Sequence, residues 1–305
     1  MRIAVVGSIN MDMTVIAERI PLKGETLRGD HISLIPGGKG ANQAVAMAKL
    51  GAEVELFGGV GDDSNGNMLL ENLKRAGVKT EHIQIIGQKS TGTAFITVAE
   101  NDNTIVVIPG ANGMVDRKYI DSIKSYLENY DMIVLQHEIP LDTVHYVVDF
   151  CTDKKLRVVL NPAPAAKVPV DIVKRVNYLT PNEHEAALMF GGGQSAEELL
   201  RQYPEKLIIT QGSRGVSVCL KSGEILHIPA RTATQVVDTT GAGDTLNGAF
   251  CVRLAAGDDL KKALMYANTA ASLSTEKFGA QTGMPTAEEV EKELEIYSQS
   301  NYIYF

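Results

Sequence analysis

The sequence predicts a layered α/β protein with a mainly parallel central sheet. Short apolar runs rich in β-branched residues alternate with stretches of helical periodicity, which is the pattern of successive βαβ units. The chain has 305 residues, enough for one large α/β domain or two ordinary ones. The strands expected in the main sheet are residues 2–7, 54–58, 132–135, 157–160, 178–180 and 206–210.

Helices are expected between these strands, because apolar residues recur there every three or four positions. The residues that share a helical face are Ala41, Val45 and Ala48; Leu69, Leu73 and Ala76; Ile120, Ile123 and Leu127; and Leu260, Leu264, Ala267 and Ala271. A last helix is predicted after Thr286, since Glu289 completes a capping box with it.

Two segments break the alternation. Residues 12–17 and 27–34 are extended with no helix between them, and residues 93–98 and 104–108 flank a polar turn at 100–103 and predict a hairpin. Both segments could form a small antiparallel sheet inserted into the main domain. Such a sheet could be a lid that excludes water from a site, or it could be an edge extension or dimer contact. These segments alone leave the choice open.

Composition excludes several classes. Hydrophobic residues make up 44% and charged residues 22%, which is the mix of a globular domain and not of a disordered chain or a coiled coil. The net charge of −8 disfavours a nucleic-acid partner, which needs a basic surface. Cys151, Cys219 and Cys251 lie far apart, which argues against a disulfide framework or a zinc site.

The sequence shows neither a membrane-spanning segment nor a signal peptide. No stretch approaches the roughly 18 consecutive apolar residues of a membrane span. The apolar run at the N-terminus ends before Asn10, too early for a signal peptide. We therefore expect a cytoplasmic protein with no membrane partner.

The most informative motif is residues 238–245, Asp-Thr-Thr-Gly-Ala-Gly-Asp-Thr, followed by a helical pattern over 246–255. Small residues let backbone N–H groups crowd together, and the following helix directs its positive end at the same point, so the turn is suited to an anion. A carboxylate there, Asp244, is suited to act as a general base beside a phosphoryl group. Taken alone, Asp244 is more commonly just a residue of a helix start.

A second glycine cluster, residues 36–43 with sequence Pro-Gly-Gly-Lys-Gly-Ala-Asn-Gln, also opens a helix. It is not a Walker A loop, because Gly40 follows Lys39 and Ser33 stands in the first glycine position. The dinucleotide fingerprint is absent after Gly7 as well. The cluster could let a small polyol approach the backbone, with Lys39 and Asn42 as donors, or it could be a helix start with a solvated lysine.

Three further segments have both a structural and a functional interpretation. Asn182 and Glu185 have the spacing of a helix N-cap and its N3 partner, or Glu185 could lie near Mg²⁺ through water. Residues 210–215 follow a strand and form either a hairpin turn or a nucleotide-contacting loop. Glu138 follows the strand 132–135, at the sheet edge where α/β proteins bind ligands.

Together these segments resemble the ribokinase branch of the PfkB-type carbohydrate kinase family. The resemblance rests on Gly7-Ser8-Ile9-Asn10-Met11-Asp12, the 37–43 cluster, Asn161-Pro162-Ala163-Pro164-Ala165, the 238–244 motif and Gly279-Ala280-Gln281. It implies a three-layer αβα ribokinase-like fold with a mainly parallel central sheet and a small β-sheet lid. The whole chain, 1–305, would be one kinase domain, with lid segments near 12–37 and 92–109 that often form a homodimer.

The resemblance also implies the chemistry, which is transfer of the ATP γ-phosphate to the primary hydroxyl of a sugar, D-ribose giving ribose 5-phosphate. Asp244 would be the catalytic base, and the backbone of Gly241, Ala242, Gly243 and Asp244 the anion hole. The sugar contacts would be Asn10, Met11, Asp12, Gly38, Lys39, Gly40, Asn42, Glu138 and Asp244.

The family pattern places ATP, Mg²⁺ and a monovalent cation, K⁺, as cofactors. Glu185 would act on Mg²⁺ through water. The nucleotide contacts would be Asn182, Thr210, Gln211, Gly212, Ser213, Arg214, Gly215, Gly243 and Asn268. The cation site would be Asp238, Thr240, Ser274, Lys277, Gly279 and Gly283, several of them through backbone carbonyls. The chain departs from the family pattern between residues 185 and 210, which leaves the length of one surface helix open.

Alternatives remain at this point. A family member could act on deoxyribose, fructose or a nucleoside, or the fold could serve a catalytically silent sugar-binding protein. The retained Asp244 and glycine turn argue against the silent protein, and the missing dinucleotide fingerprint argues against a dehydrogenase. The segment 298–305 receives no function.

Overall fold

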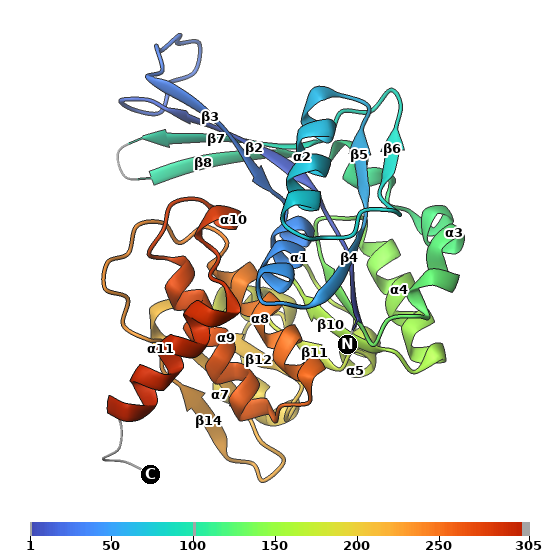
Figure 1. Cartoon of the computed structure of the whole chain (residues 1–305), viewed down its shortest axis with the longest axis vertical. Coiled ribbons are helices and arrows are strands. Elements are labelled where there is room, and N and C mark those ends of the chain that lie inside the picture. The colour runs from blue at the N-terminus through green and yellow to red at the C-terminus, as the bar shows by residue number, and fades with distance from the viewer. Residues whose placement is uncertain (1, 100–101, 301–305) are drawn as a thin grey trace.

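A computed structural model describes residues 2–99 and 102–300 of the chain. Helices cover both faces of a central sheet, and a second, smaller sheet projects from this body (Figure 1). Alternate residues of the central strand β1 (Arg2–Val6) enter the two cores that result. Ile3 and Val5 belong to one apolar cluster, and Ala4 and Val6 belong to the other. Burial on both faces is why these strands are continuously apolar.

The central sheet confirms five of the six predicted strands to within one residue at each end, whereas the sixth, at 206–210, belongs to a neighbouring antiparallel group. The order of the central sheet is β11 (Tyr178–Leu179), β10 (Arg157–Asn161), β9 (Met132–Gln136), β1 and β4 (Glu53–Phe57), all parallel. Beyond β11, isolated parallel bridges lead to an antiparallel group of β12 (Ile208–Thr210), β13 (Val216–Cys219) and β14 (Ile225–Ile228). Parallel strands present their carboxyl ends at one edge, and that edge holds the candidate site.

The helices divide between the two faces. The cluster on one face takes side chains from α1 (Lys39–Lys49), α2 (Ser64–Arg75), α8 (Ala242–Ala256), α9 (Leu260–Ser274) and α11 (Ala287–Ser300). The cluster on the other face takes them from α3 (Arg117–Leu127), α4 (Leu141–Lys154), α5 (Val170–Arg175), α6 (Glu183–Met189) and α7 (Ala196–Gln202). Along the described residues, no helix combines the length and the apolar character that crossing a bilayer requires.

Helix α8 is buried through most of its length, since every residue from Asp244 to Cys251 is buried. It packs between α1 and α9 (Figure 1). Gly248 allows the close approach, since a Cβ atom there would lie 2.7 Å from the Cβ of Ala46 on α1. This contact brings the first turn of α8 beside the first turn of α1, and with it the two glycine motifs.

The small sheet has the order β3 (His31–Gly37), β2 (Asn10–Ile16), β7 (Gly92–Ala99) and β8 (Asp102–Ile108). The outer pairs are antiparallel, as expected, but β2 and β7 are parallel. The reason is the connection between them, which passes through α1, β4 and α2, and parallel pairing needs such a crossover. Part of the predicted turn, residues 100 and 101, lies outside the described residues, as does 301–305 of the C-terminal segment.

The remaining elements are short. A parallel pair, β5 (Gly59–Gly61) and β6 (Gln84–Ile86), adjoins β4, and 3₁₀ turns span Gly110–Met114 and Gly212–Arg214. The predicted capping box at α11 is confirmed, with Thr286 N donating to Glu289 Oε2 at 2.8 Å. In the segment that departs from the family pattern, the helices α6 and α7 have seven residues each and are separated by three glycines with positive φ.

Candidate active site

The end of β9 orders the glycine cluster at the start of α1. Glu138 accepts hydrogen bonds through Oε2 from Ser8 Oγ at 2.6 Å and from the backbone N of Lys39 at 2.9 Å. Gly40 N donates in turn to Ser8 Oγ at 3.2 Å. The carboxylate of Glu138 therefore stabilises the positive end of α1, and it joins three of the predicted motifs at one edge of the sheet.

The glycines of the cluster are needed for backbone contact with the junction between β1 and β2. Gly38 has φ +90°, and a Cβ atom there would lie 2.7 Å from the N of Asn10. At Gly40 a Cβ atom would lie 2.5 Å from the N of Ser8. A larger residue at either position would push the two motifs apart. The cluster thus does more than open a helix.

Asn10 and Asp12 begin the small sheet where it leaves the main body. Asn10 Oδ1 accepts from Nδ2 of Asn112 at 2.7 Å, and Asn112 Oδ1 accepts from the N of Ile9 at 2.9 Å. Asn112 is a buried polar residue that the sequence reasoning missed, since no motif surrounds it. Between Asn10 and Asp12, the side chain of Met11 is buried in the core, because alternate residues of a strand face opposite sides.

Asp244 lies where the two glycine motifs meet. It is in the first turn of α8, after Gly241 with φ +77°, and is 7% exposed. Its Oδ2 accepts from Nδ2 of Asn42 at 2.9 Å, and its Oδ1 accepts from Nε2 of Gln43 at 3.0 Å. Burial raises the pKa of Asp244, while Lys39 and these two hydrogen bonds oppose the rise. Gln43 was not among the predicted site residues, although it ends the glycine cluster.

Lys39 is the cation at the centre of this group of carboxylates. Burial alone would lower its pKa, but the negative charges of Asp244, Glu138, Glu185 and Asp12 outweigh burial and raise it. The ammonium group therefore stays protonated at neutral pH. The pKa of Asp12 is raised to about 7, by burial first and then by the charges of Glu138 and Asp244, with Lys39 acting in the opposite direction.

The predicted anion hole is the first turn of α8, where N–H groups lack intrahelical acceptors. Within it, Ala242 N already donates to the carbonyl of Thr239 over 3.2 Å. Thr245 N donates to Gly241 O at 2.8 Å and starts the helical ladder. An anion at this point would therefore meet the positive end of a 15-residue helix.

A cavity of about 590 Å³ adjoins this turn. Seven of the predicted nucleotide residues line it, namely Asn182, Thr210, Gly212, Ser213, Gly215, Gly243 and Asn268. Gln211 and Arg214 do not line it, because both side chains bond to Glu183 on α6 and hold the loop there. The sequence reasoning missed another part of the wall, which carries no motif. That part is Ala230, Arg231, Thr232, Ala233, Val236, Leu246, Ala271, Ser272 and Thr275. Thr239 and Ala242 of the 238–245 motif complete the lining.

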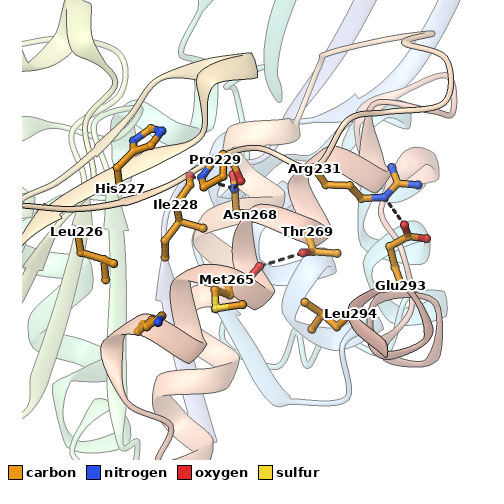
Figure 2. Close-up of a pocket in the computed structure, with 11 residues that line it drawn as sticks. Leu226, His227, Ile228, Pro229, Arg231, Met265, Asn268, Thr269, Glu293 and Leu294 are labelled. Atoms are coloured by element: carbon orange, nitrogen blue, oxygen red, sulfur yellow. Dashed lines mark hydrogen bonds and ion pairs between the residues drawn. The ribbon is translucent and has the colours of Figure 1, made fainter. Parts of the chain in front are cut away.

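A smaller, mostly apolar cavity of about 220 Å³ shares Arg231 and Asn268 with the larger one. It lies between β14, α9 and α11, as Figure 2 shows. Asn268 donates to the carbonyls of Ile228 at 3.3 Å and Pro229 at 2.6 Å, and Arg231 pairs with Glu293 at 2.6 Å. The amide of Asn268 thus fixes the backbone that forms the wall between the cavities.

The predicted capping arrangement at α6 is confirmed. Glu185 Oε2 accepts from Asn182 N, and Asn182 Oδ1 accepts from Glu185 N, both at 2.8 Å. Burial raises the pKa of Glu185, while the bond from Asn182 and the charge of Lys39 act in the opposite direction. One carboxylate oxygen is used by the cap, which leaves the other for water.

The predicted cation residues also gather in one place. Asp238 accepts from the N of Thr240 and the N of Gly279, both at 2.9 Å. At Gly283, a Cβ atom would lie 2.7 Å from the carbonyl oxygen of Ser274 and 3.2 Å from that of Lys277. The ammonium of Lys277 is directed elsewhere, to Glu289 at 2.7 Å. Backbone carbonyls and a carboxylate are oxygen ligands of the kind that K⁺ takes.

Comparisons with known proteins show the family to which the chain is related. Residues 1–287 match the family described as pfkB family carbohydrate kinase. The ribokinase of Bacillus subtilis is 47% identical over 292 residues, which cover 96% of this chain and 99% of that protein.

Two solved structures carry the same fold. A ribokinase of Thermotoga maritima has a TM-score of 0.87 at 34% identity, covering 96% of this chain and 99% of its own. A ribokinase of Arabidopsis thaliana, complexed with ribose and ATP, has a TM-score of 0.85 at 29% identity, covering 95% and 97%. These likenesses confirm the predicted fold class.

The raised pKa of Asp12 predicts a pH-dependent stability. Because the folded carboxyl binds a proton more tightly than the unfolded one, the contribution of Asp12 to native stability falls as pH rises from about 4 to about 7. Asp12→Asn carries no such charge, so the variant should be more stable than the native protein at pH 8, by roughly 1–3 kcal/mol, and nearly equal to it at pH 4. Urea unfolding at both pH values measures this, with the exposed Asp30→Asn as control. A variant equally or less stable at pH 8 contradicts the prediction.

Proposed function

The chain belongs to the pfkB family of carbohydrate kinases, and on that premise we propose that it transfers the γ-phosphoryl group of ATP to the primary hydroxyl of D-ribose, giving ribose 5-phosphate. The observation that carries the proposal is the position of Asp244. Its carboxylate lies at the first turn of α8, hydrogen-bonded to Asn42 and Gln43 of the other glycine motif. A base, an anion-binding turn and polar groups suited to a sugar therefore meet at one point.

Asp244 acts as the general base. It takes the proton of the sugar hydroxyl as that oxygen attacks the γ-phosphorus in line, a contribution typically worth about 10²–10⁴-fold. The raised pKa of the buried carboxyl supports this role, because proton transfer is most efficient when the pKa of the base lies near the working pH.

The substrate is bound by groups that suit a small polyol. Donors and acceptors around the start of α1 are offered by Asn10, Asp12, Lys39 and Glu138. Gly38 and Gly40 allow the start of α1 to lie against the backbone between β1 and β2. Hydrogen bonds to charged groups are the stronger ones, so hydroxyl recognition suits this group of charges. The name and the identity of the Bacillus subtilis relative support ribose over deoxyribose, fructose or a nucleoside.

The phosphoryl oxygens are met by the N-terminal turn of α8 and by Lys39. Preorganised donors of this kind can each be worth about 3 kcal/mol in the transition state. The adenosine end of ATP occupies the cavity lined by Asn182, Thr210, Gly212, Ser213, Gly215 and Asn268. Closure of the small sheet as a lid over the sugar excludes water from the transfer.

Two metal ions complete the proposal. Mg²⁺, when bound, neutralises charge on the ATP phosphates, and the oxygen of Glu185 that the helix cap does not use would hold one of its waters. K⁺ would be held by Asp238 and the carbonyls of Ser274 and Lys277. Because Asp238 also bonds to the N of Thr240, the cation would act on the anion-binding turn through that residue.

The outer face of the small sheet supports a homodimer formed through the lid. Strand register places five apolar side chains on the face opposite that of Asp12, each between 45% and 64% exposed: Ile32, Leu34, Phe95, Val106 and Ile108. An exposed apolar patch of this kind marks an interaction surface. We therefore assign this face to a second copy of the chain.

The base assignment predicts that Asp244→Asn folds and binds ATP but loses at least about 10²-fold in kcat with ribose. The amide cannot take a proton from the hydroxyl. Coupled ADP-release assays with ribose, deoxyribose, fructose and a nucleoside measure the loss and identify the preferred substrate, with the exposed Asp62→Asn as control. Near-native turnover in Asp244→Asn would refute the assignment, and a strong preference for another substrate would refute ribose.

The cation assignment predicts faster turnover in KCl than in NaCl at equal ionic strength. Asp238→Asn should remove most of the difference, because it takes a negative charge from the proposed cation site and weakens the bonds to Thr240 and Gly279. Initial rates at saturating ribose and ATP measure this in both salts. Equal rates of the native enzyme in K⁺ and Na⁺ would count against the site.

The dimer assignment predicts that Phe95→Glu converts a native particle of twice the chain mass into a monomer. A charge in the centre of an apolar interface is left without a partner. Light scattering on eluting protein measures the mass. Ile85→Glu, on β6 outside the small sheet and also exposed, is the matched control and should remain dimeric. A native monomer, or a Phe95→Glu dimer, would contradict the proposal.

A further inference from the structure

We propose that Gln43 is a positioning residue, which holds the carboxylate of Asp244 in its reactive orientation through a buried chain of side-chain amides. The inference rests on the proposed function, since it concerns the base of that reaction. Gln43 is fully buried, and it makes three hydrogen bonds to residues from three other elements.

The direction of every bond in the chain follows from one backbone carbonyl. The oxygen of Thr180 can only accept, so Asn161 presents Nδ2 to it at 3.0 Å and turns Oδ1 toward Gln43. Nε2 of Gln43 donates to that Oδ1 at 3.1 Å. The same amide nitrogen has a second hydrogen, which it donates to Oδ1 of Asp244 at 3.0 Å.

The far side of Gln43 closes the arrangement. Its Oε1 accepts from Nε2 of Gln136 at 2.6 Å. The Oε1 of Gln136 is buried and has no hydrogen-bond partner among the described residues. An unpaired buried acceptor costs about 1–3 kcal/mol. The fold keeps this unpaired acceptor in spite of its cost in stability. We infer that the orientation of Gln43, with its donor directed toward Asp244, has a functional role.

The second oxygen of Asp244 is held in the same manner. Oδ2 accepts from Nδ2 of Asn42, whose Oδ1 accepts from Nε2 of Gln281 at 3.0 Å. Gln281 Oε1 accepts in turn from Asn72 at 2.7 Å. Both carboxylate oxygens thus face amide donors whose orientations are set elsewhere, which fixes the plane of the carboxylate.

The same donors favour the ionised carboxylate in a site that otherwise disfavours it. Burial raises the pKa of Asp244, and the bonds from Asn42 and Gln43 act in the opposite direction. The charged groups that act on it are Lys39 from α1, Glu138 after β9, Asp12 from β2 and Glu185 from α6. Of these, only Lys39 is positive. Loss of the Gln43 donor should therefore shift the titration of the base to higher pH.

The test is the pH profile of kcat for Gln43→Met, which keeps the length of the side chain and removes its hydrogen bonds. The acid limb of this profile is the fall of kcat at low pH, where the base becomes protonated. Since a hydrogen bond to a charged group is worth about 1.5–3 kcal/mol, we expect the acid limb to shift to higher pH by about one unit or more. We expect kcat at pH 7 to fall about tenfold to hundredfold and the KM for ATP to change less than about threefold. Met47→Ala, one turn along the buried face of α1, controls for simple destabilisation and should leave the acid limb in place.

A double-variant cycle separates positioning from packing. Asn161 acts on Asp244 only through Gln43 in this account, so Asn161→Leu should shift the acid limb in the same direction. The combined variant should match Gln43→Met and show no added shift. Should Gln43→Met fail to fold, Asn161→Leu alone decides, because it leaves Gln43 in place but frees its amide to turn.

The outcomes are distinguishable from failure of the kinase assignment. A native protein that phosphorylates no sugar overturns the proposed function. The positioning role is overturned if the native protein is active and the folded Gln43→Met variant keeps the native acid limb. If Gln43→Met does not fold, the Asn161→Leu variant is judged in the same way. Additive shifts in the double variant overturn the chain of bonds.

Discussion

A carboxylate buried where two helices meet must receive hydrogen-bond donors and a compensating positive charge, or it takes up a proton. Asp244 receives all of these from α1, with amide donors in Asn42 and Gln43 and the ammonium group of Lys39. The first turn of α8 alone could supply backbone donors, but it could not orient the carboxylate. The chemistry proposed for this protein therefore depends on the contact between α1 and α8.

The fold secures that contact at several levels. Gly248 lets α8 approach Ala46 on α1, and Glu138 anchors the first residue of α1 to the end of β9. Asp238 joins the turn before α8 to Gly279. Gly279 lies in the same segment as Gly283, which packs against the carbonyls of Ser274 and Lys277. Each of these residues keeps one of the segments around Asp244 in register. A change at any of them is expected to displace the base relative to the sugar-binding groups.

The sequence predicted the fold well because apolar strands and helix caps are local signals, as at Thr286 and Asn182. The parallel pairing of β2 with β7 was not predictable in this way, because it depends on a long crossover. Within the site, the glycine motifs identified Asp244 and Asn42, since their backbone demands leave a pattern. Gln43 and Asn161 lie in recognised motifs and Gln136 lies in none, but the sequence did not reveal the roles of these three residues, because those roles arise only when distant strands and helices meet. The wall at residues 230–236 was missed for the same reason.

The most direct test is a crystal structure of the protein with ribose and a non-hydrolysable ATP analogue. We expect a carboxylate oxygen of Asp244 to lie about 2.6–3.2 Å from the primary hydroxyl of the sugar, the distance that proton transfer requires, with the γ-phosphate at the first turn of α8. A primary hydroxyl directed away from Asp244, or a triphosphate seated elsewhere, would contradict this expectation.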